Sequence, residues 1–265
     1  MMRARYAWSV ALLALSISTV GAYGPLGHEI VGAIADQKLA KTSTAQKIAG
    51  LLEGISLERA ATIADEIKSW DKNGPGDAKA YPHFPNAPRL DAQLRDFWRA
   101  NQPTHDLNSA MPSHHWFHYT DVPVSGSEKY ADGKSGRTKW DIVHMMNFCI
   151  GVLQGDQPED NARKITKPIA VVLLVHFAGD IHQPLHVGAE YFDGQGHVVN
   201  PDEGADALDD EGGNSLTLNL TSNGAAAAAR PPRFHGFWDS DAVLANFPPL
   251  PETMTKEEKY ARTEE

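Results

Sequence analysis

The stretch that decides the fold is VVLLVHFAGDIHQPLH, residues 171–186. Apolar residues at helical or continuous spacing over 165–181 predict a central buried helix, and this run is too short to cross a bilayer. The spacing of apolar residues predicts further helices over 30–52, 91–101 and 139–154. We therefore expect a mainly helical chain.

Loops are expected between these helices. Five prolines make 71–108 irregular outside its short helix, and glycines with acidic residues predict a long loop over 188–213. Residues 215–220 are compatible with a short strand. We predict an all-α fold with long loops and at most a short β-hairpin. A length of 265 residues without an internal repeat predicts one domain over residues 23–265.

The central segment also carries chemistry. Positions i and i+4 share one face of a helix, so His176 and Asp180 can point at one place, and Pro184 would bend the chain that carries His186. An imidazole and a carboxylate inside an apolar helix are costly without a partner, and metal is the usual one. The alternative is a core histidine satisfied by its neighbour.

Two further motifs offer metal ligands. His235 and Asp239 repeat the His-x-x-x-Asp spacing, and zinc accepts both groups, so two such pairs indicate more than one metal ion. In YGPLGH, the α-amine and carbonyl of Tyr23 could bind metal together with His28 once a leader is removed. An exposed His and Asp in the first motif, and a Gly-Pro turn in the second, remain as alternatives.

The first 22 residues have the build of a secretory signal peptide. Arg3 and Arg5 precede a short apolar stretch, and small residues end it at Ala22. A transmembrane anchor is the alternative, but the apolar stretch is short and nothing like a stop-transfer sequence follows. We predict a secreted or periplasmic protein without a membrane anchor, beginning at Tyr23.

Charge and cysteine content limit the chemistry. The formal net charge is −10, and it becomes −12 when Arg3 and Arg5 are removed. A protein that held nucleic acid mainly by neutralising phosphates would be basic, so this one would have to rely on metal and base stacking. Cys149 is the sole cysteine, which excludes an internal disulfide and a thiolate cluster. Any metal must therefore bind His and Asp.

The order of motifs from Tyr23 to Asp239 resembles that of a known family. YGPLGH, ATIADEIK, FHYTDVP, HFAGDIHQPLH, GGN and FHGFWD follow one another as in the tri-zinc single-strand nucleases and 3′-nucleotidases of the S-one and P-one type. The resemblance implies the helical fold shared with zinc phospholipase C and three zinc ions in a cleft. It also implies hydrolysis of single-stranded RNA and DNA to 5′-phosphate products, with 3′-nucleotides as further substrates. We expect a monomer.

The resemblance implies a role for each ligand position. Asp65, His118, His176 and Asp180 resemble the ligands of one zinc ion, and Asp180 resembles a bridge to a second. The second zinc would be held by the amine and carbonyl of Tyr23 and by His28. His186, His235 and Asp239 resemble the ligands of the third.

The same resemblance suggests the catalytic and substrate-binding residues. Asp65 would orient the nucleophile, and Lys68 and Asn214 would stabilise charge on the phosphoryl oxygens. Tyr119 would stack on a base while Asp121 accepts a hydrogen bond from the base edge. A solvated helix charge at Lys68 and a core aromatic at Tyr119 are the alternatives.

This sequence departs from the family pattern in places. Tyr23 stands where the family usually has Trp, and Ile63 stands where a Trp often precedes the catalytic Asp, so both changes affect packing rather than ligation. Only 26 residues follow Asp239, whereas the family continues into further helices. We therefore expect a truncated C-terminal part and a stability below that of a full-length relative.

Two rival functions stay open. A phosphodiesterase of the zinc phospholipase C type typically has Glu in the place of Asp239, and the Tyr119 and Asp121 pocket suits a base better than a lipid headgroup. A non-catalytic exported zinc-binding protein would keep the ligands but has no need of Lys68 and Asn214.

Overall fold

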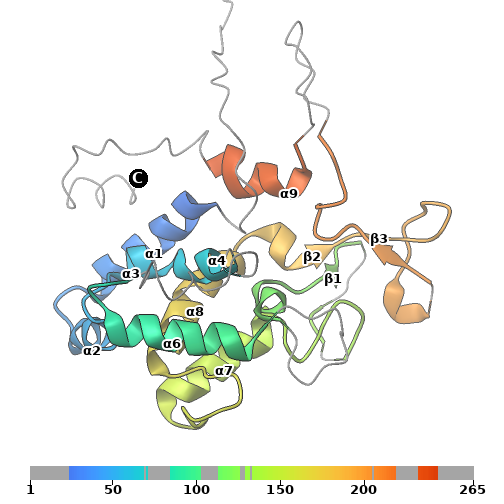
Figure 1. Cartoon of the computed structure of the whole chain (residues 1–265). Coiled ribbons are helices and arrows are strands. Elements are labelled where there is room, and N and C mark those ends of the chain that lie inside the picture. Colours follow the sequence, from blue (N-terminus) through green and yellow to red (C-terminus); the bar gives the residue numbers. More distant parts are fainter. Residues whose placement is uncertain are drawn as a thin grey trace, which may run out of the picture.

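The computed structural model of the chain is mainly helical, which confirms the all-α prediction (Figure 1). It describes residues 24–68, 70, 84–102, 113–125, 129–131, 133–204, 206–218 and 232–243. The predicted leader, Tyr23 and residues 244–265 lie outside the described residues, as do 71–83 and 103–112 of the predicted irregular segment.

The α-helices are α1 (Pro25–Leu39), α2 (Ser43–Leu51), α3 (Leu57–Ala60), α4 (Ile63–Lys68), α6 (Pro88–Ala100), α7 (Ile142–Gln154), α8 (Lys167–Asp180) and α9 (Phe234–Gly236). Short 3₁₀ turns are η1 (His114–His118), η2 (Pro184–His186) and η3 (Pro201–Glu203), and η4 (Phe237–Asp241) is a π-helical turn. The strands are β1 (Val122–Pro123), β2 (Gly188–Ala189), β3 (Tyr191–Phe192) and β4 (Leu208–Asp209).

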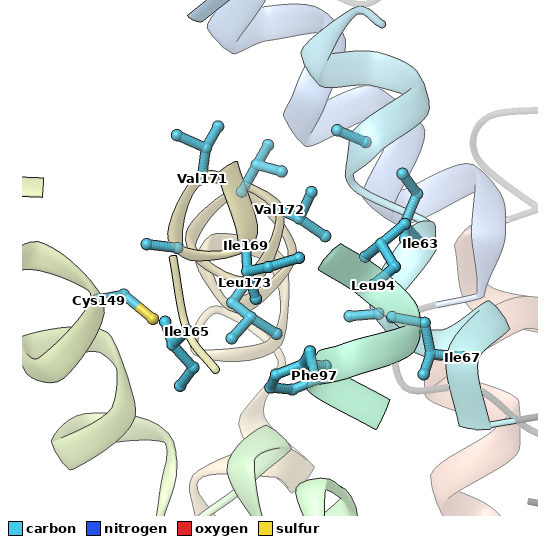
Figure 2. Packing of buried hydrophobic residues seen from close by; sticks show 14 of the residues in the cluster. Ile63, Ile67, Leu94, Phe97, Cys149, Ile165, Ile169, Val171, Val172 and Leu173 are labelled. Atoms are coloured by element: carbon cyan, nitrogen blue, oxygen red, sulfur yellow. The ribbon is translucent and has the colours of Figure 1, made fainter. Parts of the chain in front are cut away.

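Helix α8 is the centre of the fold. It is apolar on all sides, and such a helix is stable only when other elements surround it. It contacts α1, α2, α3, α4, α6 and α7. Figure 2 shows side chains of α8 packed against residues of its neighbours, among them Ile63, Ile67, Leu94, Phe97 and Cys149. His176 and Asp180 are therefore carried by the most deeply buried helix.

Local capping explains where the helices begin and end. The side chains of Thr42, Ser56 and Asp141 accept hydrogen bonds from the first turns of α2, α3 and α7. Gly155 ends α7 in the left-handed conformation, with φ 89°. The predicted helices over 91–101, 139–154 and 165–181 correspond to α6, α7 and α8, and the 30–52 pattern divides into α1 and α2.

The β-structure exceeds the prediction. The predicted loop over 188–213 contains β2, β3 and β4, and β3 pairs with β4 in antiparallel fashion. β1 pairs with β2 in parallel, with Val122 opposite Gly188, and this pair is additional to the single hairpin that we allowed. It joins segments far apart in sequence, so no local pattern could indicate it. In the predicted strand, Thr217 forms only an isolated bridge, to Arg233, and residues 219–220 lie outside the described part.

None of the helices in the described ranges is long and apolar enough to cross a membrane.

Candidate metal centre

The centre begins with the His176 and Asp180 pair at the carboxyl end of α8. His176 Nδ1 lies 2.6 Å from the Ala61 carbonyl oxygen, which can only accept, so Nδ1 carries the proton. The lone pair of Nε2 then faces inward, 3.1 Å from Asp180 Oδ2. A backbone carbonyl thus fixes the tautomer that a metal ligand needs.

Two segments complete the first group of ligand atoms. His118, at the end of η1, brings Nδ1 to 3.0 Å from both Asp180 Oδ2 and His176 Nε2. Asp65 of α4 brings Oδ1 to 3.6 Å from His176 Nε2. The structure thus brings together Asp65, His118, His176 and Asp180, the four residues expected to share one metal ion.

His28 lies beside this group. Its ring stacks on His176, with ring centroids 3.8 Å apart, and its Nε2 lies 3.3 Å from Asp180 Oδ1. Asp180 therefore directs Oδ2 at the first group and Oδ1 at His28, as a bridging carboxylate would. Tyr23, the expected partner of His28, lies outside the described residues. The next residue, Gly24, donates its backbone N–H to the Asp239 carbonyl at 2.6 Å.

The third group joins η2 to the last described elements. His186 Nδ1 lies 2.9 Å from the His118 carbonyl oxygen, and His235 Nδ1 lies 2.8 Å from that of Gly212, so both rings turn Nε2 toward Asp239. His235 Nε2 is 3.3 Å from Asp239 Oδ2, and His186 Nε2 is 3.9 Å from Oδ1. The three expected ligands of one ion therefore meet.

The donor atoms fit metal ions. Within the described part of the chain, His186 Nε2 is buried and has no hydrogen-bond partner, and buried Asp180 Oδ1 accepts no hydrogen bond although His28 Nε2 lies 3.3 Å away. Burying such groups unpaired is expensive, whereas a cation between them would use their lone pairs. Imidazole nitrogen and carboxylate oxygen, without thiolate, form a ligand set that zinc accepts.

The protonation states agree with ligation. Burial lowers the pKa of His186 to about 4 and, aided by Lys68, puts that of His118 well below its usual value, so both rings are neutral near pH 7. Burial raises the pKa of Asp180, but nearby imidazoles outweigh it and hold the carboxyl ionised. Burial lowers the pKa of His176, but the carboxylates of Asp180 and Asp65 have the larger effect, so the pKa is raised. A cation bound to the same carboxylates would lower the pKa of His176 again.

The expected phosphate-binding residues differ in position. Lys68 brings Nζ to 2.7 Å from Asp65 Oδ1, at the edge of the first group. Asn214 comes two residues after Gly212, whose carbonyl holds His235, but its side-chain amide donates to the Glu211 carbonyl at 3.1 Å. Lys68 is thus directly beside a candidate ligand, whereas Asn214 would have to turn its amide to reach a phosphate.

The expected base pocket directly follows the candidate ligand His118. The Tyr119 ring is partly buried and lies against Trp116, with ring centroids 5.8 Å apart. Burial and the neighbouring carboxylates raise the pKa of Asp121 to about 7. The Asp121 carboxyl therefore exchanges its proton close to neutral pH.

Sequence reasoning missed the groups that orient the ligands. These are the carbonyls of Ala61, His118 and Gly212, and the Gln183 side chain. Sequence reasoning also missed Trp116, whose ring lies against Tyr119 of the expected base pocket. Gln183 is inside the HQPLH motif, so its position between the candidate ligands Asp180 and His186 could have indicated its role. The histidines without a predicted role are absent from the ligand groups found among the described residues; His83 and His105 lie outside these residues.

The sequence model of the S1/P1 nuclease family matches residues 23–263. The chain belongs to the S1/P1 nuclease family. It is also similar to Endonuclease 4 of Arabidopsis thaliana, with 26% identity over 139 residues. That match covers 48% of this chain and 38% of the plant protein, so this chain spans well under two thirds of that relative. Family membership confirms the resemblance seen in the motifs.

Proposed function

We propose that this protein is an exported zinc-dependent nuclease that hydrolyses phosphodiester bonds of single-stranded RNA and DNA to 5′-phosphate products. We propose 3′-nucleotidase activity at the same site, and three zinc ions per chain. Membership of the S1/P1 nuclease family and the name of the plant relative support nuclease activity.

The observation that carries the proposal is the set of three His and Asp groups, in which every member except the partly exposed Asp65 is buried. In His176, His186 and His235, a backbone carbonyl takes the Nδ1 proton, and Nε2 of each ring faces a carboxylate. Core histidines satisfied by chance would not share this arrangement. Tyr23 completes the proposed ligand set through its amine and carbonyl after the leader is removed.

Bound zinc would lower the pKa of a water molecule to about 7 and would polarise the phosphate. The protein's own groups do the remaining work. Asp65, which faces both His28 and His176, accepts a hydrogen bond from the attacking water and orients it. Lys68 stabilises negative charge on a phosphoryl oxygen in the transition state. Asn214 turns its amide from the Glu211 carbonyl and donates a hydrogen bond to the same phosphoryl group.

Single-strand preference would come from the base pocket. An aromatic ring stacks only on an unpaired base, and each stacked base contributes about 1–3 kcal/mol. Tyr119 is partly exposed and follows His118 directly, so a base on its ring would lie next to the reacting phosphate. Asp121 would accept or share a hydrogen bond at the base edge.

Two alternatives remain. Asp239 and the aromatic pocket disfavour the phospholipase C type, while Lys68 beside Asp65 disfavours a zinc-binding protein without catalysis. A lipid-phosphate substrate and a nucleic acid substrate should therefore be compared directly.

The test is hydrolysis of single-stranded RNA, single-stranded DNA, a 3′-nucleotide and phosphatidylcholine by the chain that begins at Tyr23. We expect cleavage of the first three substrates with zinc, 5′-phosphate ends from the polymers, and no reaction with chelator or in Asp65→Asn. Three bound zinc ions without any cleavage would favour the binding-only alternative, and cleavage of the lipid alone would favour the phospholipase.

A further inference from the structure

Gln183 lies between two segments that carry candidate ligands. It follows α8 and precedes η2, and only 1% of its surface is exposed. Its backbone N–H donates to the Asp180 carbonyl at 3.0 Å. Its side chain crosses to the π-helical turn η4, where Nε2 lies 2.7 Å from Asp239 Oδ1. Gln183 thus connects the end of the central helix with the last candidate ligand.

The orientation of the amide follows from its partners. The backbone N–H of Leu185 lies 2.5 Å from Oε1, and an N–H can only donate, so the oxygen must face Leu185. The amide nitrogen then faces Asp239, whose carboxylate can accept. Both ends of the Gln183 amide are therefore used, and the side chain cannot flip without losing two hydrogen bonds in a buried place.

This contact decides how the Asp239 carboxylate is turned. With Oδ1 held by Gln183, Oδ2 is directed at His235 Nε2, 3.3 Å away. A lysine or arginine here would also hold the carboxylate, but its charge would compete with a metal ion for it. A neutral donor orients the carboxylate and leaves its negative charge available.

We propose that Gln183 is a positioning residue for the third metal site, which fixes the Asp239 carboxylate against His186 and His235 before a metal ion binds. This inference rests on the proposed function, because it assumes that these three residues bind zinc. Gln183 touches neither substrate nor metal, and it acts through Asp239 alone.

The experiment measures metal binding rather than hydrolysis. Zinc is titrated into the chelator-treated chain beginning at Tyr23, and the affinities of successive zinc equivalents are determined for the native protein, Gln183→Met and Gln183→Glu. In both variants we expect one equivalent to bind 10–100-fold more weakly, as is typical when the partner of a metal ligand is removed, while the other equivalents keep their affinities. In the cobalt-substituted protein, the visible absorption of one site should change.

Gln93→Met is the matched control. The side-chain amide of Gln93 in α6 is also hydrogen-bonded, accepting from the Thr166 hydroxyl, but Gln93 lies on a helix without candidate ligands, so all zinc affinities should stay native. The Glu variant keeps the size of Gln183, so a folding failure of the Met variant does not end the test.

Three results would overturn the inference. One is native zinc affinity in both Gln183 variants. Another is that the Gln183 variants bind none of the zinc equivalents and melt at a lower temperature than Gln93→Met, which would mean that Gln183 has a general structural role. If the native protein bound no zinc at all, the proposed metal centre itself would be wrong, whereas zinc binding without nuclease activity would leave the role of Gln183 intact.

Discussion

At the scale of single residues, the direction of a candidate ligand atom depends on the contacts that other atoms of the same side chain make. His176 has two nitrogens, and only the Ala61 carbonyl determines which one faces Asp180. The two oxygens of Asp180 likewise face different partners, His118 and His28. One buried side chain can therefore serve two ligand groups.

Lys68 provides the first prediction at this scale. Lys68→Met should lower kcat for single-stranded DNA by roughly 10²–10³-fold, because one donor to the transition-state charge is lost. Zinc content should not change, since Lys68 pairs with Asp65 from the edge of the site. Lys164→Met removes a surface ion pair with Asp160 and should leave kcat native. An unchanged kcat in Lys68→Met would contradict the assigned role.

Asp121 provides a prediction about pH. Burial and the charges of Asp209, Asp210, Glu211 and Asp141 raise its pKa from 3.8 to about 7. Between these values the folded protein keeps a proton that the unfolded chain releases, so the contribution of Asp121 to stability decreases as pH rises from about 4 to about 7.

Asp121→Asn removes this dependence. The free energy of unfolding of the variant, relative to the native protein, should therefore increase between about pH 4.5 and about pH 7.5, as measured by urea denaturation. Asp193→Asn is the control. The pKa of Asp193 is lowered rather than raised, and its side chain is hydrogen-bonded to His197 in an exposed loop, so this variant should not show the increase. If the free energies of unfolding of Asp121→Asn and the native protein differed by the same amount at both pH values, the pKa of Asp121 would not be raised in the folded protein.

At the scale of elements, α8 serves both as the core helix and as the carrier of the site. Its residues pack on all sides, so the direction of His176 and Asp180 is fixed by the whole core rather than by the local chain. Helix α1 lies against α8 closely enough that Gly179 has no space for a side chain. The position of His28 therefore depends on a glycine in another helix.

Gly179→Ala tests this helix contact. The added β-carbon would lie 2.7 Å from His28 Nδ1 and should displace the ring, weakening the zinc equivalent shared by His28 and Asp180 and costing about 1–3 kcal/mol of stability. Zinc titration and thermal unfolding measure both effects. Gly50→Ala in α2 meets no atom within 4 Å and should stabilise the protein by about 0.5–1 kcal/mol. Native zinc affinity in Gly179→Ala would show that His28 is not held in this way.

At the scale of the whole molecule, the candidate centre joins α1, α4, η1, α8, η2, α9 and η4. The carboxylates of Asp180 and Asp239 are buried, and a cation bound to them would offset the cost of burying their charge, so bound zinc should contribute strongly to global stability.

Metal removal tests this coupling. Each site with free zinc at 100 times its dissociation constant should stabilise the folded state by about 2.7 kcal/mol, so chelator should lower the melting temperature and added zinc should restore it. His186→Ala should show a smaller zinc-dependent shift than the native protein. Equal melting temperatures with zinc and with chelator would rule out a metal centre that stabilises the fold.

The sequence by itself determined the helical fold class, because the spacing of apolar residues follows the helix period and is a local property. It also supplied the candidate ligands and their order, since residue types such as His176 and Asp239 are read directly. Only the tertiary structure decided which atoms face one another: the tautomer of His176, the amide of Gln183 and the pairing of β1 with β2 all depend on partners distant in sequence. Packing around α8 sets these contacts, and a local pattern carries no information about them.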